Sequence, residues 1–142
     1  MPIMTYTTDV AVSKTMGEIQ AALARRGVTR ISTMFDDQGI AAGIGFTMRT
    51  DFGFRDFELP VRTAGVLAAM QRDAKVPRSR CNPEQAARVA WRIAKVWLEA
   101  QSALIDAQLA TLDEVMLPYL INGATGETLY SVWRSTQKAI ES

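Results

Sequence analysis

The chain has 142 residues, a formal net charge of +1 and 48% apolar residues, values typical of one globular domain. It contains no histidine and only one cysteine, Cys81, which argues against Ser-His-Asp chemistry, the usual zinc sites and an internal disulfide. No apolar run reaches the roughly 18 residues of a membrane helix, and the start lacks a secretory signal pattern. We expect a single domain over residues 1–142 in a reducing cytoplasm, with no catalytic residues, metal or cofactor.

The first half of the chain predicts a helix and a small antiparallel sheet. Thr15 and Glu18 have the spacing of a capping box, and Gly27 follows two arginines, so we expect a helix over residues 15–26. Asp36–Gly39 has turn chemistry between two β-rich runs, the pattern of a hairpin. The expected strands are residues 4–12, 28–35, 40–48 and 54–61.

One of these strands has a nearly bare face. Ile44, Phe46 and Met48 alternate with Gly43 and Gly45, so one side is apolar and the other has almost no side chains. The bare side leaves room for another backbone or a ligand to approach closely.

The second half predicts helices. Residues 63–75 fit a short helix and residues 76–81 a basic loop. Asn82-Pro83-Glu84-Gln85 combines an N-cap, a proline at the first helical position and a capping box. A helix therefore starts here and runs without a breaker to about Leu109, a length of about 40 Å.

Two shorter helices follow. Thr111 and Glu114 form a capping box ahead of Pro118, and residues 128–140 fit a terminal helix. The expected fold class is α+β, with a small antiparallel sheet of three or four strands packed on one long helix with shorter flanking helices. The N-terminal helix and sheet region covers residues 1–62, and the helical region covers residues 63–142.

The long helix has two apolar stripes. We expect the broad stripe to face the sheet; it contains Ala86, Val89, Ala90, Ile93, Val96, Trp97, Ala100 and Leu104. The narrower stripe repeats every seven residues, at Trp91, Leu98 and Ile105. Either the C-terminal helices cover this second stripe, or it is the interface of a homo-oligomer, with a dimer favoured; ligand contact is a third interpretation.

Charge changes sign along the same helix. Residues 72–95 contain seven basic and two acidic side chains, whereas residues 96–142 contain two basic and six acidic ones. A nearly neutral chain that gathers its positive charge in one segment can attract a phosphate-bearing partner there.

The predicted site lies at the start of the long helix. Arg78 and Arg80 precede a capped helix N-terminus, where free N–H groups and the helix dipole favour an anion. An aromatic ring, Trp91, lies beside the cations that follow, which adds a stacking surface. The expected phosphate-binding residues are Arg78, Arg80, Arg88, Arg92 and Lys95, with Trp91 as the stacking residue. The alternative is that these charges form an ordinary solvated face.

Two other groups are weaker candidates. Phe52, Phe54 and Phe57 lie near a strand turn, where core and rim positions are the simplest interpretation and an exposed ring offers a stacking surface. Asp56 and Glu58, with Asp51, form a hard-metal site only if the third strand of the hairpin sheet brings them together.

The chain resembles a group of small phage and prophage proteins of unassigned function. The matching segments are VSKTMGEIQAALARRGVTR, the hairpin, and ARVAWRIAKVWLEAQSALIDAQLATLDEVMLPYLINGATGETLY, from about Val12 to Tyr130. The segment with WR, K, LEAQ and LID followed by EVMLPYL is the most recognisable part. The group resembles proteins encoded near phage recombination and single-strand-binding genes, which implies a nucleic-acid-related role in the host cell cytoplasm.

Together these features predict a non-enzymatic phage accessory protein that binds single-stranded nucleic acid. The alternative is an anti-defence protein that sequesters an anionic nucleotide signal or blocks a host defence protein. A hydrolase with a carboxylate-bound metal is a third, weaker possibility. The expected partners are single-stranded nucleic acid or an anionic nucleotide and a second copy of the chain, with no membrane.

Overall fold

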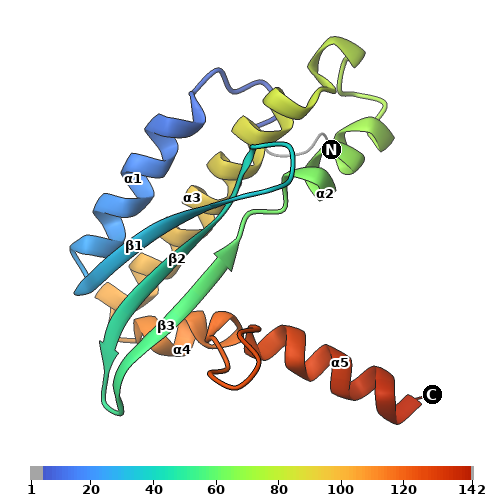
Figure 1. The fold of residues 1–142 in the computed structure, drawn as a ribbon. Coiled ribbons are helices and arrows are strands. Elements are labelled where there is room, and N and C mark those ends of the chain that lie inside the picture. Colours follow the sequence, from blue (N-terminus) through green and yellow to red (C-terminus); the bar gives the residue numbers. More distant parts are fainter. Residues whose placement is uncertain (1–4, 142) are drawn as a thin grey trace.

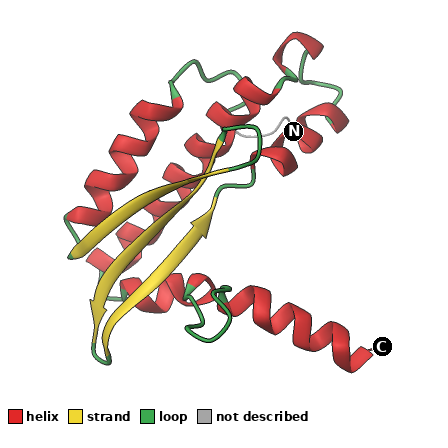
Figure 2. Cartoon of the chain, in the orientation of Figure 1, coloured by secondary structure: helices red, strands yellow, loops and turns green. Residues whose placement is uncertain are grey.

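The computed structural model describes residues 5–141 and has an α+β fold. Figure 1 shows its elements, and Figure 2 separates helices from strands. In chain order they are α1 (Val12–Ala24), β1 (Val28–Phe35), β2 (Ala41–Thr50), β3 (Gly53–Pro60), α2 (Thr63–Arg72), α3 (Pro83–Asp106), α4 (Leu112–Met116) and α5 (Leu129–Glu141). Two short 3-10 turns, η1 (Arg78–Arg80) and η2 (Leu117–Tyr119), precede α3 and follow α4.

The sheet has three antiparallel strands in the order β1-β2-β3. The predicted turn closes the first hairpin, because the Asp36 carboxylate accepts hydrogen bonds from the backbone N–H groups of Gln38 and Ile40, both at 2.9 Å. β2 pairs with both neighbours, with Ile44 opposite Thr33 on one side and Leu59 on the other. The hairpin predicted from the sequence is therefore confirmed.

The strand predicted over residues 4–12 is wrong for the part that the structure describes; residue 4 lies outside it. Residues 5–7 form a turn, and α1 already starts at Val12. The carbonyls of Tyr6 and Thr8 accept hydrogen bonds from the Gln85 side-chain amide of α3, at 2.8 and 2.9 Å. These carbonyls therefore bind to a helix instead of pairing with a neighbouring strand.

The capping box predicted at Thr15 and Glu18 is wrong as well. α1 starts three residues earlier, so Thr15 lies inside the helix and is fully buried. Both side chains contact Arg92 of α3 instead. A threonine and a glutamate three residues apart fit a helix start, but they also fit one face of a helix interior, because residues three apart are neighbours there.

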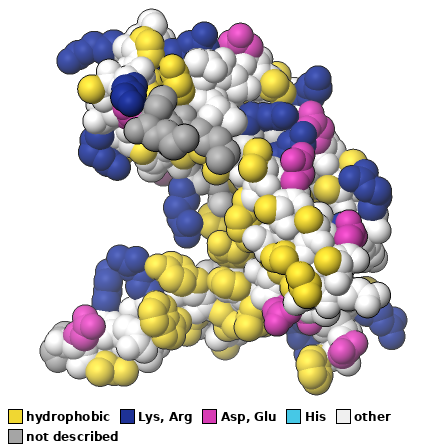
Figure 3. Space-filling view, turned by 180° about the vertical axis from the view of Figure 1, so that it is seen from behind, with side chains coloured by type: hydrophobic (Ala, Val, Ile, Leu, Met, Phe, Trp, Pro, Cys, Tyr) yellow, Lys and Arg dark blue, Asp and Glu magenta, His cyan; other side chains and the backbone are white. Residues whose placement is uncertain are grey.

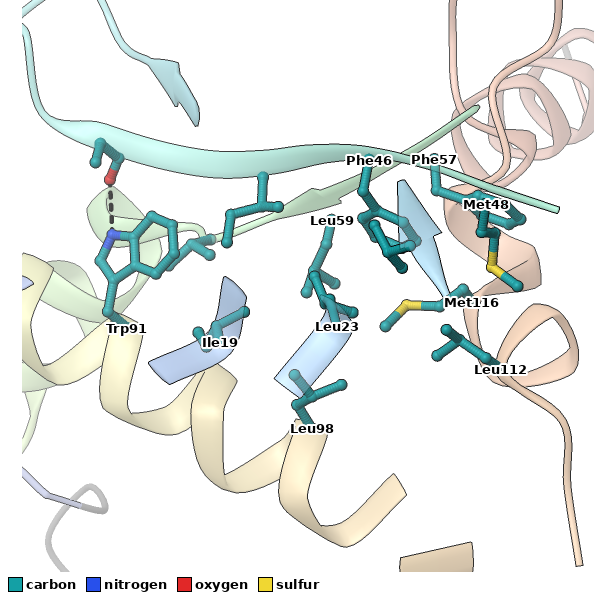
Figure 4. Close-up of a cluster of buried hydrophobic side chains, with 14 of the residues drawn as sticks. Ile19, Leu23, Phe46, Met48, Phe57, Leu59, Trp91, Leu98, Leu112 and Met116 are labelled. Carbon is teal, nitrogen blue, oxygen red and sulfur yellow. Dashed lines mark hydrogen bonds between the residues drawn. The ribbon is translucent and has the colours of Figure 1, made fainter. Parts of the chain in front are cut away.

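The helices α1 and α3 cover one face of the sheet, and no helix of residues 5–141 lies over the opposite face (Figure 1). The core between the layers joins Ile19 and Leu23 of α1, Phe46 of β2, and Trp91 and Leu98 of α3 (Figure 4). Phe46 and Phe57 stack across the two strands with ring centroids 5.3 Å apart. Leu112 and Met116 of α4 close the end of this core.

The bare face of β2 is filled by side chains of β1. A Cβ at Gly43 would lie 2.6 Å from the Met34 methyl carbon, and one at Gly45 would lie 2.8 Å from the Ser32 hydroxyl. The two glycines therefore make room for the side chains of their cross-strand neighbours.

The helices of the second half follow the sequence closely. α3 ends at Asp106, three residues before the expected end, and Gln108 takes a left-handed conformation with φ 63°. The Thr111–Glu114 capping box is present, with both hydrogen bonds at 3.3 Å. α5 leaves the body after η2 and points away from it (Figure 1).

The position of Trp91 in the core gives a stability prediction. Trp91 is fully buried, and its Nε1–H donates a 2.9 Å hydrogen bond to the Ala41 carbonyl of β2. Trp91→Ala is expected to lower the free energy of unfolding by about 3–5 kcal/mol, measured by chemical denaturation. The control Phe35→Ala removes an exposed ring and should change it by less than about 0.5 kcal/mol. Equal effects of the two substitutions would show that Trp91 is not part of the core.

Candidate functional site

The start of α3 forms as predicted but binds the chain's own N-terminal segment. The Asn82 side chain accepts a 2.8 Å hydrogen bond from the Gln85 backbone N–H. The Gln85 side chain does not complete a capping box; it is buried, and its amide binds the carbonyls of Tyr6 and Thr8. Its Oε1 also accepts a 2.9 Å hydrogen bond from Nε of Arg88. Residues 5–9 thus lie where we expected an anion.

The two arginines before α3 have different environments. Arg80 Nη1 lies 3.3 Å from the Asp9 carboxylate and 3.4 Å from the Thr7 carbonyl, so it also helps hold the N-terminal segment. Arg78 is exposed, and no ion pair to it is found among residues 5–141. Only Arg78 of this pair is available to an external anion without breaking an internal contact.

The cations farther along α3 are paired with α1. Arg92 Nη1 lies 3.3 Å from Glu18 Oε2 and 3.2 Å from the Thr15 hydroxyl. Lys95 binds the same Glu18 carboxylate and lies 3.0 Å from Glu99. One acidic side chain on α1 therefore ties down two of the five predicted phosphate-binding residues.

These contacts shift two pKa values. The hydrogen bond from Lys95 lowers the pKa of Glu18 below its ordinary value of 4.5, with further lowering by the positive charges of Lys95 and Arg92. The hydrogen bond to Glu18 raises the pKa of Lys95 above 10.5, and the hydrogen bond to Glu99 adds to this shift. Both groups are thus charged over a wide pH range, as a stable tie between α1 and α3 requires.

The predicted stacking role of Trp91 is wrong. The indole is fully buried between α3 and β2, and its single donor is used by Ala41. Figure 4 shows the ring pointing into the core toward the sheet. A base cannot stack on a ring that has no accessible face.

The predicted oligomer interface at Trp91, Leu98 and Ile105 is wrong for the same reason. Trp91 and Leu98 belong to the buried core, and Ile105 is half-buried and packs against it. This narrow stripe, not the broad one, faces the sheet along the C-terminal part of α3. The broad stripe is buried at Ala86 and Val89, where α2 covers it, and becomes exposed beyond α2.

The five predicted phosphate-binding residues therefore do not form one cradle with a ring beside it. Two are tied to α1, Arg80 is tied to Asp9, Arg88 is held by Gln85, and Arg78 stands in an exposed loop. Arg72 and Lys75 lie near Arg78 in sequence and are exposed. What remains is a small cationic surface at the α2–α3 connection, without a stacking ring on the same loop.

An aromatic and cationic surface does exist, at the turn between β2 and β3. Phe52 is 81% exposed and Phe54 is 56% exposed. The Arg49 guanidinium carbon lies 5.7 Å from the centre of the Phe54 ring, within the range of a cation–π contact. The Thr50 hydroxyl fixes the turn, because it accepts a hydrogen bond from the Phe52 N–H and donates one to the Gly53 carbonyl.

The open face of the sheet continues from this turn. Phe46 and Phe57 face the core, so their neighbours Thr47 and Asp56 point to the opposite side, and the pairing adds Arg30, Arg49 and Phe54 to that side. The position of Phe54 could be predicted from the alternation of the strand. Phe54 is three residues before the buried Phe57, so the two side chains point to opposite faces of the sheet. We name the exposed residues Arg30, Arg49, Phe52 and Phe54 the hairpin surface.

Within residues 5–141 the structure gives neither a metal-binding cluster nor a membrane-spanning helix. No three His, Cys, Asp or Glu side chains in this range come together in a way that fits a metal ion, and Asp56 accepts a hydrogen bond from Thr47. In the same range no helix has both the length and the apolar content to span a bilayer. Comparisons with protein-family models, with curated proteins and with solved structures each give no match. The function is therefore argued from the molecule's own surfaces.

The tie between α1 and α3 predicts a pH dependence of stability. Glu18 has a lowered pKa, so its contribution is present above 4.5 and is lost as the pH falls through the folded-state value. Lys95 has a raised pKa, so its contribution is present below 10.5 and is lost as the pH rises through the folded-state value. The difference in Tm between the parent and Glu18→Gln should be largest near neutral pH and narrow at both extremes.

Thermal unfolding followed by circular dichroism over this pH range provides the measurement. Asp37→Asn is the control, because Asp37 is exposed in the β1–β2 turn and makes no ion pair among the described residues. A Tm difference for Glu18→Gln that does not change with pH would rule out the charged tie.

Proposed function

We propose that the protein is a non-enzymatic accessory protein that binds single-stranded nucleic acid through the hairpin surface. The observation that carries the proposal is a pair of exposed rings, Phe52 and Phe54, beside the Arg49 guanidinium at a fixed strand turn. Unstacked bases bind aromatic faces without strong sequence preference, and nearby arginines neutralise the backbone. The resemblance to phage proteins supports the same class of target.

The architecture supports this use of the sheet. All the packing against α1 and α3 is on one face, so the other face of the sheet is left uncovered next to the two rings (Figure 1). Small sheets that bind single-stranded RNA use the same arrangement, with aromatic side chains on the open face and helices behind.

The charges of the platform set the expected strength of binding. Arg30 and Arg49 are offset by Asp56 and Glu58 on the same face, so stacking must supply most of the affinity. Among residues 5–141, two cations of this surface, Arg30 and Arg49, can reach phosphates. We therefore expect a shallow salt dependence, with a slope of about −1.4 in log K against log salt concentration.

Binding to a fluorescein-labelled oligothymidylate of about 20 nucleotides, followed by fluorescence anisotropy, tests the proposal. The double variant Phe52→Ser/Phe54→Ser should bind at least about 10-fold more weakly, because each stacked base contributes about 1–3 kcal/mol. Phe35→Ser is the matched control, since Phe35 is 63% exposed on β1 and lies outside the hairpin surface.

A second variant tests whether the nucleic acid binds the hairpin surface or the cationic surface at the α2–α3 connection. Lys75→Ala/Arg78→Ala changes the α2–α3 connection and should leave binding within about 2-fold, because these two exposed cations lie outside the hairpin surface. If this variant loses binding and the phenylalanine variant does not, the site is at the start of α3 and the hairpin assignment is wrong. A parent protein that binds a dinucleotide but not the oligonucleotide would contradict the proposed polymer ligand.

A further inference from the structure

A cleft with a volume of about 520 Å³ opens between the end of β3 and the start of α5. Figure 3 shows Lys or Arg side chains on both sides of the recess beside α5. The polar side chains that line the cleft are Arg62, which follows β3, and Thr128, Tyr130, Ser131 and Arg134 from the start of α5. Arginine and hydroxyl side chains are among the groups that bind the phosphate and sugar oxygens of nucleic acids. The cleft therefore has the composition of a phosphate-binding site.

The helix α5 turns its polar side toward this cleft. Ser131 and Arg134 line the cleft, and the helical period places Trp133 and Ile140 on the other side of the helix. An amphipathic helix that packs on its own chain does so through its apolar side. The polar side of α5 at the cleft therefore indicates a polar ligand and not closure of α5 onto the sheet.

The two arginines of the cleft, Arg62 and Arg134, make no ion pair within residues 5–141. Arg134 Nη1 donates a 3.2 Å hydrogen bond to the Tyr130 hydroxyl, which holds the guanidinium beside the ring. Glu58 is the acidic side chain in the lining of the cleft, so two positive charges face one negative charge. The cleft therefore differs from the middle of α3, where Glu18 binds both neighbouring cations.

The uncovered face of the sheet connects this cleft to the hairpin surface. A hollow of about 300 Å³ on that face is lined by Arg30, Thr47 and Glu58, and Glu58 also lines the cleft. β3 has 8 residues and runs from the rings to the cleft, a distance of about 25 Å at about 3.3 Å per residue. A single strand whose bases stack at the hairpin surface can thus reach the cleft along one face of the molecule.

We propose that this cleft binds the phosphodiester backbone of the single strand whose bases stack at the hairpin surface. The inference rests on the proposed function and adds a second contact to it. Arg62 and Arg134 neutralise phosphates at the cleft, because a guanidinium group presents paired N–H donors to phosphate oxygens. Asp56 and Glu58 lie on β3 between the rings and the cleft, and their charges disfavour phosphates in the middle of the sheet. The strand is therefore held at the two ends of the uncovered face.

The salt dependence of binding tests the second contact. The slope of about −1.4 in log K against log salt concentration counts the two cations of the hairpin surface alone. A labelled oligothymidylate of about 20 nucleotides that also reaches the cleft meets two more cations, so the slope should steepen to about −2.8. Arg62→Gln/Arg134→Gln should return the slope to about −1.4 and weaken binding by about 10-fold at low salt, measured by fluorescence anisotropy.

Two further variants show that the effect belongs to the charges of the cleft. Arg62→Lys/Arg134→Lys keeps both charges and should keep the parent's slope. Lys75→Ala/Arg78→Ala also removes two exposed cations, but they lie outside the cleft, so the slope should not change. Circular dichroism of each variant must show the parent's helix content and melting transition, so that unfolding is not mistaken for loss of binding.

The outcomes separate the cleft from the hairpin surface. If the parent's slope is near −1.4 and Arg62→Gln/Arg134→Gln leaves it unchanged, while Phe52→Ser/Phe54→Ser loses binding, the cleft assignment is overturned and the proposed function stands. If the arginine variant loses binding and the phenylalanine variant does not, the result supports the phosphate site at the cleft and contradicts stacking at the hairpin surface. A parent that binds no oligonucleotide overturns both.

Discussion

The burial of Trp91 sets the rotation of α3 about its own axis, and most of the surface of the molecule follows from that rotation. The indole fills the space between α3 and β2 and donates its one hydrogen bond to the Ala41 carbonyl. Leu98 and Ile105 lie seven and fourteen residues on and turn to the same side. The stripe that contains Val96 and Leu104 must then point outward, because the two stripes lie on nearly opposite sides of the helix.

The same rotation decides what the cations do. With Trp91 directed at the sheet, Arg92 and Lys95 lie over α1, where Glu18 binds both of them. A cluster that could have bound an external anion is thereby used to tie two helices together. The Glu18 carboxylate is 74 residues away from Arg92 along the chain, so the local charge balance of residues 72–95 gives no information about it.

The surfaces left open lie on opposite sides of the molecule. The hairpin surface and the uncovered face of the sheet point away from α1 and α3, whereas Val96 and Leu104 are exposed on the side of α3 that faces away from the sheet (Figure 1).

Local sequence determined most of the elements. Asn82 and Pro83 fixed the start of α3, Asp36 and Gly39 the first hairpin turn, and the alternation along residues 40–48 the buried side of β2, because caps, turns and strand periodicity act within a few residues. The same reasoning gave a wrong strand for the segment before α1, because the carbonyls of this segment are bound by Gln85 from the second half of the chain.

Tertiary structure alone decided which of the two stripes of α3 is buried and which acidic residue pairs with Arg92 and Lys95. Each of these outcomes depends on the volume and the hydrogen-bonding groups of residues far away in the chain. A helical period shows that two faces are apolar, but only the fit of a large ring against a neighbouring strand selects the one that goes inside.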